Sequence, residues 1–144
     1  MSERPEPRPR SAYRHSTRIT LRWADNDAYG HVNNTIYYAW FDTAVNEWLV
    51  ESGLLDIASG DAIGLVVETG CRYFMPLSYP GEVEILLGVE GLGQSSVTYR
   101  LGVFPPGSEQ ASAEGHFTHV YVDRRSRRPA PLREAWRSKL AELV

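Results

Sequence analysis

The sequence predicts one α+β domain in which an antiparallel sheet of five strands wraps around a single long helix. Three observations support this prediction. A pattern typical of a half-buried strand opens the domain, a long segment with helical apolar spacing follows it, and four more strand patterns fill the second half. Because no repeat and no linker interrupts this order, residues 13–144 are expected to fold as one unit.

A strand, a loop and a helix are predicted in the first third of the domain. Residues 16–23 alternate between polar and apolar side chains and end on an apolar tryptophan, which is typical of a half-buried strand. Residues 25–31 are expected to form a loop. Asn33 or Asn34 is a good N-cap, so a helix is predicted over residues 35–51.

The second half of the domain contains four runs with strand character. They are residues 63–74, 82–90, 95–104 and 111–122. Turn sequences are expected to join neighbouring strands at residues 79–81, 91–93 and 105–107. Pro131 then opens a short amphipathic helix, and its apolar edge consists of Leu132, Trp136, Leu140 and Leu143.

The predicted long helix is apolar around most of its circumference. Only a narrow line through Asp42, Asn46 and Glu47 is clearly polar, so the helix is expected to be enclosed. A single five-stranded sheet covers one side of such a helix and leaves two strand edges open. A second copy of the chain is the simplest cover, so at least a homodimer is expected, and a tetramer of two dimers remains open.

The composition excludes several classes of protein. The net charge of −3 lacks the basic excess typical of nucleic-acid-binding proteins. The single Cys71 allows no intrachain disulfide and argues against a thiolate metal cluster. No metal site is expected, since His116 and His119 would lie on opposite faces of one strand.

The chain start gives no sign of export. Residues 1–12, MSERPEPRPRSA, are polar with three prolines at alternate positions, and they are expected to form a disordered or extended tail. No apolar run is long enough for a secretory signal or a membrane span. A cytoplasmic location is therefore expected.

A polar cluster lies immediately before the predicted long helix. Residues 25–34 contain two acids, a Gly-His pair and three asparagines. The first N–H groups of a helix have no partner within the helix, and the helix dipole is positive there. Negative charge can therefore be held at this point, and an enzyme could place its chemistry there.

The cluster carries a resemblance to a known family. The pattern D-x-D-x-x-G-H-V-N-N-x-x-Y, from Asp25 to Tyr37, resembles the signature of hotdog-fold acyl-CoA thioesterases, and is most similar to the 4-hydroxybenzoyl-CoA thioesterase-like family. The resemblance extends over residues 15–143 through a Gly-Leu-Val-Val-Glu strand, an Arg-Tyr-x-x-Pro-Leu passage and the terminal helix. It implies the hotdog fold.

The resemblance also implies a mechanism. The second acid of the pattern, Asp27, is the expected catalytic carboxylate, as a nucleophile or as a base that activates water. The backbone N–H of Asn34, at the start of the helix, is the expected donor to the carbonyl oxygen. Preorganised N–H donors at a helix start suit a developing oxyanion, which agrees with the interpretation of the residues alone. No cofactor is expected besides the coenzyme A of the substrate.

Related plant thioesterases of acyl-carrier proteins combine an acid, an Asn, a His and a Glu on the next strand. The matching positions here are Asp27, Tyr29, His31 and Glu68, so the Asn is missing and that site is incomplete. His31 and Glu68 are kept as catalytic auxiliaries. An unpaired carboxylate in an apolar strand is costly, so Glu68 is expected to have a partner or to face an opening.

Each candidate also has a structural interpretation. Asp27 could cap loop N–H groups, and Asp25 is expected to be structural, either paired with Arg22 or holding the loop. His31 is either a general acid for the leaving thiol or a hydrogen-bonding residue at the helix entry. Substrate contacts are expected from a further set of residues: Tyr29, Gly30, Asn33, Tyr37 and Arg72.

The predicted function is hydrolysis of an acyl-CoA thioester to a carboxylic acid and free CoA. The alternatives are a non-catalytic acyl-CoA-binding or partner-regulating hotdog module and a thioesterase of acyl-carrier proteins. A hotdog dehydratase is disfavoured because its paired His and Asp motif is absent. Coenzyme A phosphates could contact the basic turn at residues 124–128, although a solvated loop is the simpler interpretation. The sequence does not select the acyl group.

Overall fold

The computed structural model describes residues 5–56, 58 and 60–144. Its strands and α-helices follow the chain in this order: β1 (His15–Thr20), α1 (Asn34–Glu51), β2 (Ala62–Tyr73), β3 (Glu82–Leu92), β4 (Ser96–Phe104), β5 (Ala113–Asp123) and α2 (Glu134–Ala141). Short 3-10 turns cover Arg10–Ala12 (η1) and Trp23–Asp25 (η2). The α+β class and the order of the elements are as the sequence predicts.

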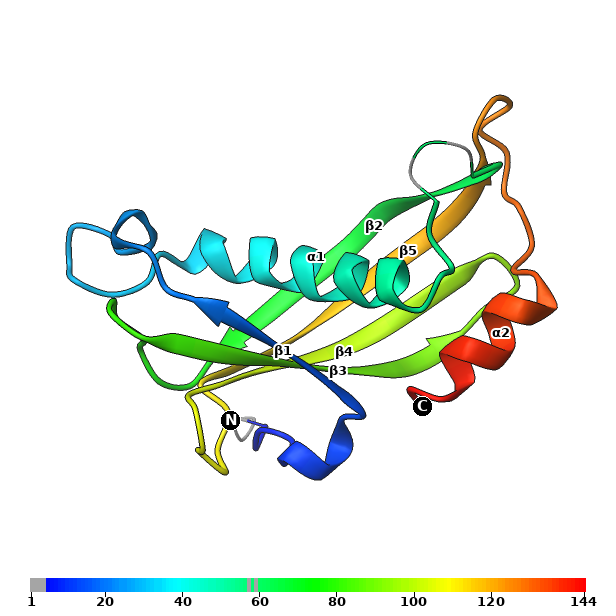
Figure 1. Ribbon diagram of the computed structural model, residues 1–144. Helices are drawn as coiled ribbons and strands as arrows, with labels where there is room; N and C mark the ends of the chain where they lie inside the picture. The colour runs from blue at the N-terminus through cyan, green and yellow to red at the C-terminus, as the bar shows by residue number, and fades with distance from the viewer. Residues whose placement is uncertain (1–4, 57, 59) are drawn as a thin grey trace.

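The five strands form one antiparallel sheet in the order β1-β3-β4-β5-β2, and α1 lies across one face of it (Figure 1). We call this the inner face and the opposite one the outer face. The expected hairpins from β3 to β4 and from β4 to β5 are confirmed. The turn expected at residues 79–81 does not link neighbouring strands, and this prediction is wrong. Strand β2 lies at one edge of the sheet beside β5, whereas β3 lies between β1 and β4. Residues 74–81 instead cross over the end of the sheet.

The first strand is shorter than predicted. It ends at Thr20, and Trp23 lies in η2 with 78% of its surface exposed. Leu21 still packs in the core, and its N–H donates to the Gly81 carbonyl at 2.8 Å. The chain turns after Leu21 because the buried Asp25 carboxylate binds the backbone and the guanidinium of Arg22. Simple alternation could not reveal this turn.

Helix α1 packs on the sheet through one broad stripe. The buried side chains are Tyr37, Trp40, Phe41, Ala44, Val45, Trp48 and Leu49. Thr35, Ala39, Asp42 and Thr43 are exposed. Within one chain the helix is therefore covered on one side only, as the sequence predicts for a single five-stranded sheet.

The Phe41 ring of α1 packs directly against Gly115 of β5. A Cβ atom at this position would lie 2.5 Å from the Phe41 ring and 2.4 Å from the Gly70 carbonyl oxygen. Interiors are close-packed, and a backbone oxygen cannot move aside as a flexible side chain can. Only glycine therefore lets α1 and β2 sit at this distance from β5.

We expect Gly115→Ala to lower the free energy of unfolding by about 2 kcal/mol, because overpacking forces a shift of the backbone or of Phe41. Chemical denaturation measures the change. Gly91→Ala is the matched control, since a Cβ at that strand glycine meets no atom within 4 Å. Equal stability of the two variants would contradict the packing described here.

The C-terminal helix begins later than predicted. Residues 131–133 are not helical, and α2 starts at Glu134 with Arg133 as its N-cap. The Leu132 N–H instead donates to the Gln94 carbonyl at 2.9 Å, which keeps this stretch against the β3–β4 turn. The predicted apolar edge is confirmed, because Leu132, Leu140 and Leu143 are buried and Trp136 packs against the core.

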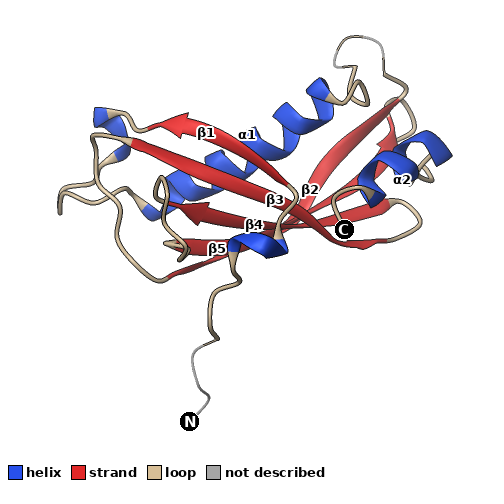
Figure 2. Ribbon diagram, turned by 60° about the horizontal axis from the view of Figure 1, so that its bottom comes forward, coloured by secondary structure: helices blue, strands red, loops and turns tan. Residues whose placement is uncertain are grey.

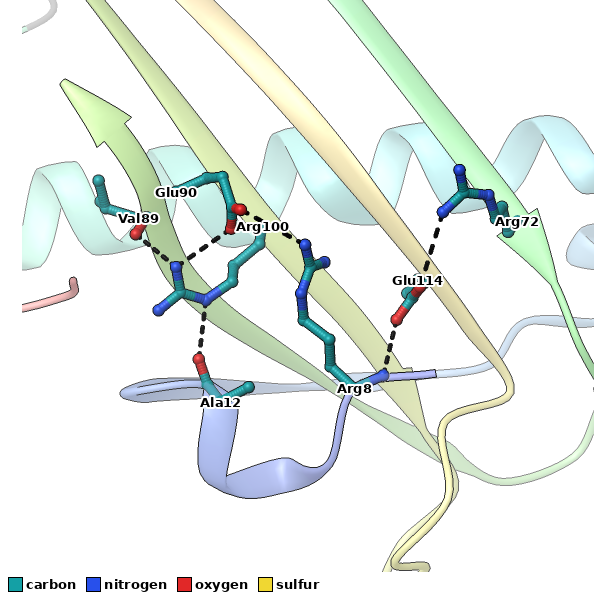
Figure 3. Close-up of polar contacts among 7 residues, drawn as sticks. All are labelled: Arg8, Ala12, Arg72, Val89, Glu90, Arg100 and Glu114. Atoms are coloured by element: carbon teal, nitrogen blue, oxygen red, sulfur yellow. Dashed lines mark hydrogen bonds and ion pairs between the residues drawn. The ribbon is translucent and has the colours of Figure 1, made fainter. Parts of the chain in front are cut away.

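The segment before β1 contacts the outer face of the sheet. Figure 2 shows η1 lying over this face, with α1 on the other side. The Arg8 N–H donates to Glu114 at 2.9 Å, and the Arg100 Nε donates to the Ala12 carbonyl at 2.8 Å (Figure 3). Tyr13 packs its ring on Phe104. Contacts with the sheet thus begin before residue 13, while residues 1–4 of the expected tail lie outside the described part.

No helix in the described residues is both long and apolar enough to cross a membrane.

Candidate active site

The loop before α1 is held by a buried carboxylate. Asp25 is 1% exposed and accepts hydrogen bonds from the Arg22 backbone N–H at 2.8 Å, from Nε at 3.0 Å and from Nη2 at 2.7 Å. The Asp25 carbonyl also accepts the Asn33 N–H at 2.8 Å. The predicted pairing of Asp25 with Arg22 is confirmed, and it fixes both ends of the loop.

Asp27 closes a tight turn within this loop. One carboxylate oxygen, Oδ1, accepts the Tyr29 N–H at 2.8 Å and the His31 N–H at 3.4 Å. The Asp27 N–H in turn donates to the His31 carbonyl at 2.8 Å, and Gly30 adopts a φ of 83° that favours glycine. The second oxygen, Oδ2, has no partner among the described residues. Asp27 therefore caps the turn with one oxygen and keeps the other free.

The loop is also tied to the segment that follows β2. The Val32 N–H donates to the Leu77 carbonyl at 2.7 Å, and the Ser78 hydroxyl donates to the Gly30 carbonyl at 2.8 Å. Two stretches that are distant in the chain, with 48 positions between Gly30 and Ser78, are therefore fixed against each other. These bonds hold the turn at Asp27 in place.

Asn33 is the N-cap of α1. Its side-chain oxygen accepts the Thr35 N–H at 3.0 Å, as the sequence predicts. Asn34 is the first helical residue, and its N–H has no acceptor among the described residues. An unpaired N–H at the positive end of an 18-residue helix is a ready donor for a developing negative charge.

We expect Asn33→Ala to lower the free energy of unfolding by about 1 kcal/mol, because the Thr35 N–H loses its acceptor. Asn34→Ala is the matched control, since no hydrogen bond in the described chain uses its side chain and its backbone N–H is kept. Thermal or chemical denaturation of the pair gives the difference. A loss in Asn34→Ala as large as that in Asn33→Ala would contradict the assignment of the cap.

A cleft of about 280 Å³ opens beside the start of α1. Its lining residues are His31, Val32, Asn34, Tyr37, Tyr73, Phe74, Met75 and Pro76. Tyr37 is almost fully buried at the inner wall, and burial raises the pKa of its phenol to about 12. The cleft is thus mostly apolar and aromatic, with Asn34, whose N–H is unpaired, on its wall. We call it the α1 cleft.

Three of the expected site residues line this cleft directly: His31, Asn34 and Tyr37. Asp27 does not line it but is joined to His31 by two hydrogen bonds, and Asn33 caps the adjacent helix. Tyr29 stands at the exposed tip of the turn, beside Gly30.

Tyr73, at the end of β2, is a site residue that the sequence analysis did not select. Its hydroxyl donates to the Asn34 carbonyl at 2.9 Å, and its ring packs edge-on against Tyr37, with 4.9 Å between ring centroids. Burial is the main reason why the pKa of Tyr73 is raised, so its hydroxyl stays a donor at neutral pH. Tyr73 is the tyrosine of the Arg-Tyr-x-x-Pro-Leu passage, and its place in this passage is the feature of the sequence that could have identified it as a site residue.

The structure does not bring Glu68 or Arg72 to the cleft. Glu68 lies opposite Thr118 on the outer face, and its carboxylate is 2.8 Å from Nε2 of the exposed His116. Glu68 therefore has the partner that the sequence required. Arg72 lies on the same outer face, 3.9 Å from Glu114 (Figure 3).

The remaining polar candidates lie elsewhere. His116 is exposed and His119 is buried, on opposite faces of β5 as predicted. No group of three potential metal ligands occurs in the part of the chain that the structure describes. The arginine turn after β5 begins at the end of the sheet remote from the α1 cleft, because β2 runs from Ala62 beside Asp123 to Tyr73 beside Ala113.

Comparisons with known proteins agree with this architecture. A family model described as the thioesterase-like superfamily matches residues 21–140. The chain is similar to the crystal structure of the PA5185 protein from Pseudomonas aeruginosa strain PAO1, with 51% identity, a TM-score of 0.92 and 96% of each chain covered. The predicted fold is thereby confirmed. The search of curated proteins gave no match.

A second similar structure is that of Slr0204, a 1,4-dihydroxy-2-naphthoyl-CoA thioesterase from Synechocystis. It is 21% identical, with a TM-score of 0.80 over 89% of this chain and 96% of that chain, and at this identity the likeness shows the fold alone. The family model spans most of the sequence and includes the whole loop and helix that form the α1 cleft. The chain therefore belongs to the thioesterase-like superfamily and is a thioesterase of the hotdog fold.

Proposed function

We propose that the protein hydrolyses acyl-CoA thioesters in the α1 cleft. The observation that carries this proposal is the unpaired Asn34 N–H, at the positive end of a long helix and beside a mostly apolar cleft. A thioester carbonyl oxygen placed there gains a preorganised donor as it becomes an oxyanion. The free Oδ2 of Asp27 stands on the turn that also carries His31, a residue of the same wall.

Two routes to hydrolysis of the thioester use these groups. As a nucleophile, Asp27 attacks the carbonyl carbon, the C–S bond breaks with its electron pair on sulfur, and water then hydrolyses the mixed anhydride. As a base, Asp27 takes a proton from water, whose oxygen attacks the same carbon, and the C–S bond then breaks with its electron pair on sulfur. His31 is the candidate that protonates the departing thiolate in either route. The products are a carboxylic acid and free CoA, and no further cofactor takes part.

Structural neighbours that share this fold include thioesterases of CoA thioesters. Slr0204 is a 1,4-dihydroxy-2-naphthoyl-CoA thioesterase, and another neighbour, BH1999, is a gentisyl-coenzyme A thioesterase. A panel of aryl, short-chain and long-chain acyl-CoAs, followed with a thiol reagent, tests the proposal. Release of free CoA from at least one substrate at a rate proportional to enzyme is the expected result. Release from none, with the protein folded, would contradict it.

A second candidate function is a non-catalytic acyl-CoA-binding module. The observation in its favour is that Oδ1 of Asp27 already has a structural use in the turn. Tight binding of an acyl-CoA with no product over hours, in both wild type and Asp27→Asn, would favour this interpretation. Loss of a measurable turnover in Asp27→Asn would favour the enzyme.

We further propose that the active form is a homodimer joined along β2. One edge of β2 pairs with β5, and no described strand pairs with the other edge. The exposed edge carries Leu65, Val66 and Val67, of which Val67 is 58% exposed. A free apolar edge is a template for strand pairing, so a second copy is the natural cover.

We expect Val67→Lys to convert the dimer to a monomer, because a lysine on a strand edge opposes pairing. Sedimentation velocity measures the change in mass. Val50→Lys is the matched control, since Val50 is 49% exposed but lies at the end of α1 rather than on β2. A dimer that survives Val67→Lys, or a monomeric wild type, would exclude assembly along this edge.

A further inference from the structure

Three aromatic side chains are exposed on the segments beside the α1 cleft. Trp23 is 78% exposed, Tyr29 is 88% exposed and Tyr79 is 38% exposed. Single exposed apolar residues need no explanation, but a cluster beside a cleft marks an interaction site. The segments that carry them are hydrogen-bonded to each other through Ser78 and Gly30.

Two members of this set, Trp23 and Tyr79, contact each other. The rings of Trp23 and Tyr79 meet edge to face, with 5.8 Å between their centroids and an interplanar angle of 88°. The Tyr79 N–H donates to Oδ1 of Asn26 at 3.1 Å, and the Leu21 N–H anchors the neighbouring Gly81. Since an edge-to-face contact uses only part of the indole surface, most of Trp23 stays open to a ligand.

The cluster continues from the mouth of the α1 cleft. Met75 lines the cleft and is 40% exposed, and Tyr79 follows four residues later. Because an extended chain rises at most about 3.6 Å per residue, the two residues lie within about 14 Å of each other. The inner wall, at Val32 and Tyr37, is buried. An acyl group that enters toward Tyr37 therefore leaves the rest of its thioester on the Met75 side.

The side chains of the cluster favour a neutral planar ring as the ligand group that binds there. Residues 22–33 and 74–81 contain a single arginine and no lysine, and that arginine, Arg22, is paired with Asp25. The cluster thus offers no free cation to a phosphate or to an acidic partner protein. Its few side chains also fall short of the roughly 800 Å² per partner of a stable protein interface. Stacking of a heteroaromatic base on an aromatic face fits both the size and the charge.

We propose that Met75, Tyr79 and Trp23 form a track that leads to the adenine ring of the acyl-CoA, with the adenine stacked on Trp23 and the phosphates left in solvent. The proposal rests on the proposed acyl-CoA substrate. These residues would let the enzyme distinguish an acyl-CoA from an acyl group on the shorter pantetheine.

Calorimetry with adenosine 3′,5′-bisphosphate, which is the nucleotide end of CoA, tests binding without catalysis. We expect saturable binding to wild type and a dissociation constant at least about tenfold higher for Trp23→Ala, because base stacking is worth about 1–3 kcal/mol. Trp23→Phe should lie between the two. Val50→Ala, an exposed apolar residue remote from the cluster, should bind as wild type does. Equal affinity of wild type and Trp23→Ala would overturn the proposal.

Kinetics with a matched pair of thioesters separates this track from the acyl site. For Trp23→Ala we expect KM for the acyl-CoA to rise about tenfold with kcat nearly constant, as the loss of one stacked base implies. KM for the same acyl group on pantetheine, which lacks the nucleotide, should change much less. An equal rise for both substrates, or a change in oligomeric state that accounts for it, would overturn the proposal. If wild type hydrolyses neither thioester, the proposed function fails, and calorimetry still decides nucleotide binding.

Discussion

Replacement of Asp27 by asparagine should lower kcat by about 10³-fold on any acyl-CoA that the wild type hydrolyses. A neutral amide cannot attack the thioester carbonyl or take a proton from water, and loss of such a group costs about 10²–10⁴-fold. The amide oxygen of the Asp27→Asn variant can still accept the Tyr29 N–H, so the turn is kept. KM and the melting temperature should therefore change little. Steady-state kinetics and thermal denaturation measure these quantities.

The matched control for this variant is Asp42→Asn. Asp42 is exposed on α1, away from the cleft, and its carboxylate accepts the Asn46 amide at 3.0 Å. The same change of charge there should leave kcat within about twofold, because no reacting group of the proposed site touches it. If Asp27→Asn retains wild-type kcat, or if both variants lose activity equally, Asp27 is not the catalytic carboxylate.

The elements of the fold and two of the hairpins could be predicted from the sequence, but the neighbour of β2 could not. Alternation along residues 82–90 and 95–104 shows which side chains are buried, and the short turn between them leaves one pairing available. The passage at residues 74–81 has turn residues too, yet it crosses the end of the sheet and places β2 beside β5. Periodicity defines a buried face and carries no information about which strand completes it.

In the candidate site, too, the local contacts could be predicted from the sequence and the long-range contacts could not. The N-cap at Asn33 and the pairing of Asp25 with Arg22 are local contacts, so the sequence could predict them. The hydrogen bond from Tyr73 to Asn34 joins residues 39 positions apart and depends on the final packing of β2. Long-range contacts of this kind leave no spacing signal in the sequence.

The position of Glu68 depends on an irregularity in β2. Ile63 and Leu65 lie opposite Val122 and Val120 on the outer face, and the register then shifts between Val66 and Glu68. The extra residue changes the alternation by one, so Glu68 joins the outer face rather than the inner one. A bulge inside an apolar run has no residue type that marks it, and counting from the sequence could not place this carboxylate.

A second large effect concerns stability in acid and depends on His119. The ring lies on β5 beneath α1, between Phe117 and Tyr121 and edge-on to Tyr99, and Asp42 is the charged group of α1 that acts on it. Burial lowers the pKa of His119 from its ordinary 6.5 to about 4, although the charge of Asp42 partly opposes this. The folded protein therefore holds a neutral imidazole.

The sign of the pH dependence follows from the two pKa values. Between pH 6.5 and 4 the unfolded chain binds a proton on His119 that the folded chain does not, so stability is full above pH 6.5 and falls as the pH drops. The free energy of unfolding should decrease by about 3 kcal/mol over this window. Urea denaturation at constant protein concentration measures it.

His119→Phe should remove this part of the acid loss. Nδ1 of His119 has no hydrogen-bond partner in the described residues, so a phenyl ring in the same aromatic surroundings gives up no bond at that atom. His116→Gln is the matched control, because His116 is exposed on the outer face of the same strand. The free energy of unfolding of this variant should fall with pH as that of the wild type does. The His119→Phe variant deletes only the protonation of His119. If the stability of His119→Phe falls between pH 6.5 and 4 as steeply as that of the wild type, carboxylates rather than this buried ring control the loss of stability in acid.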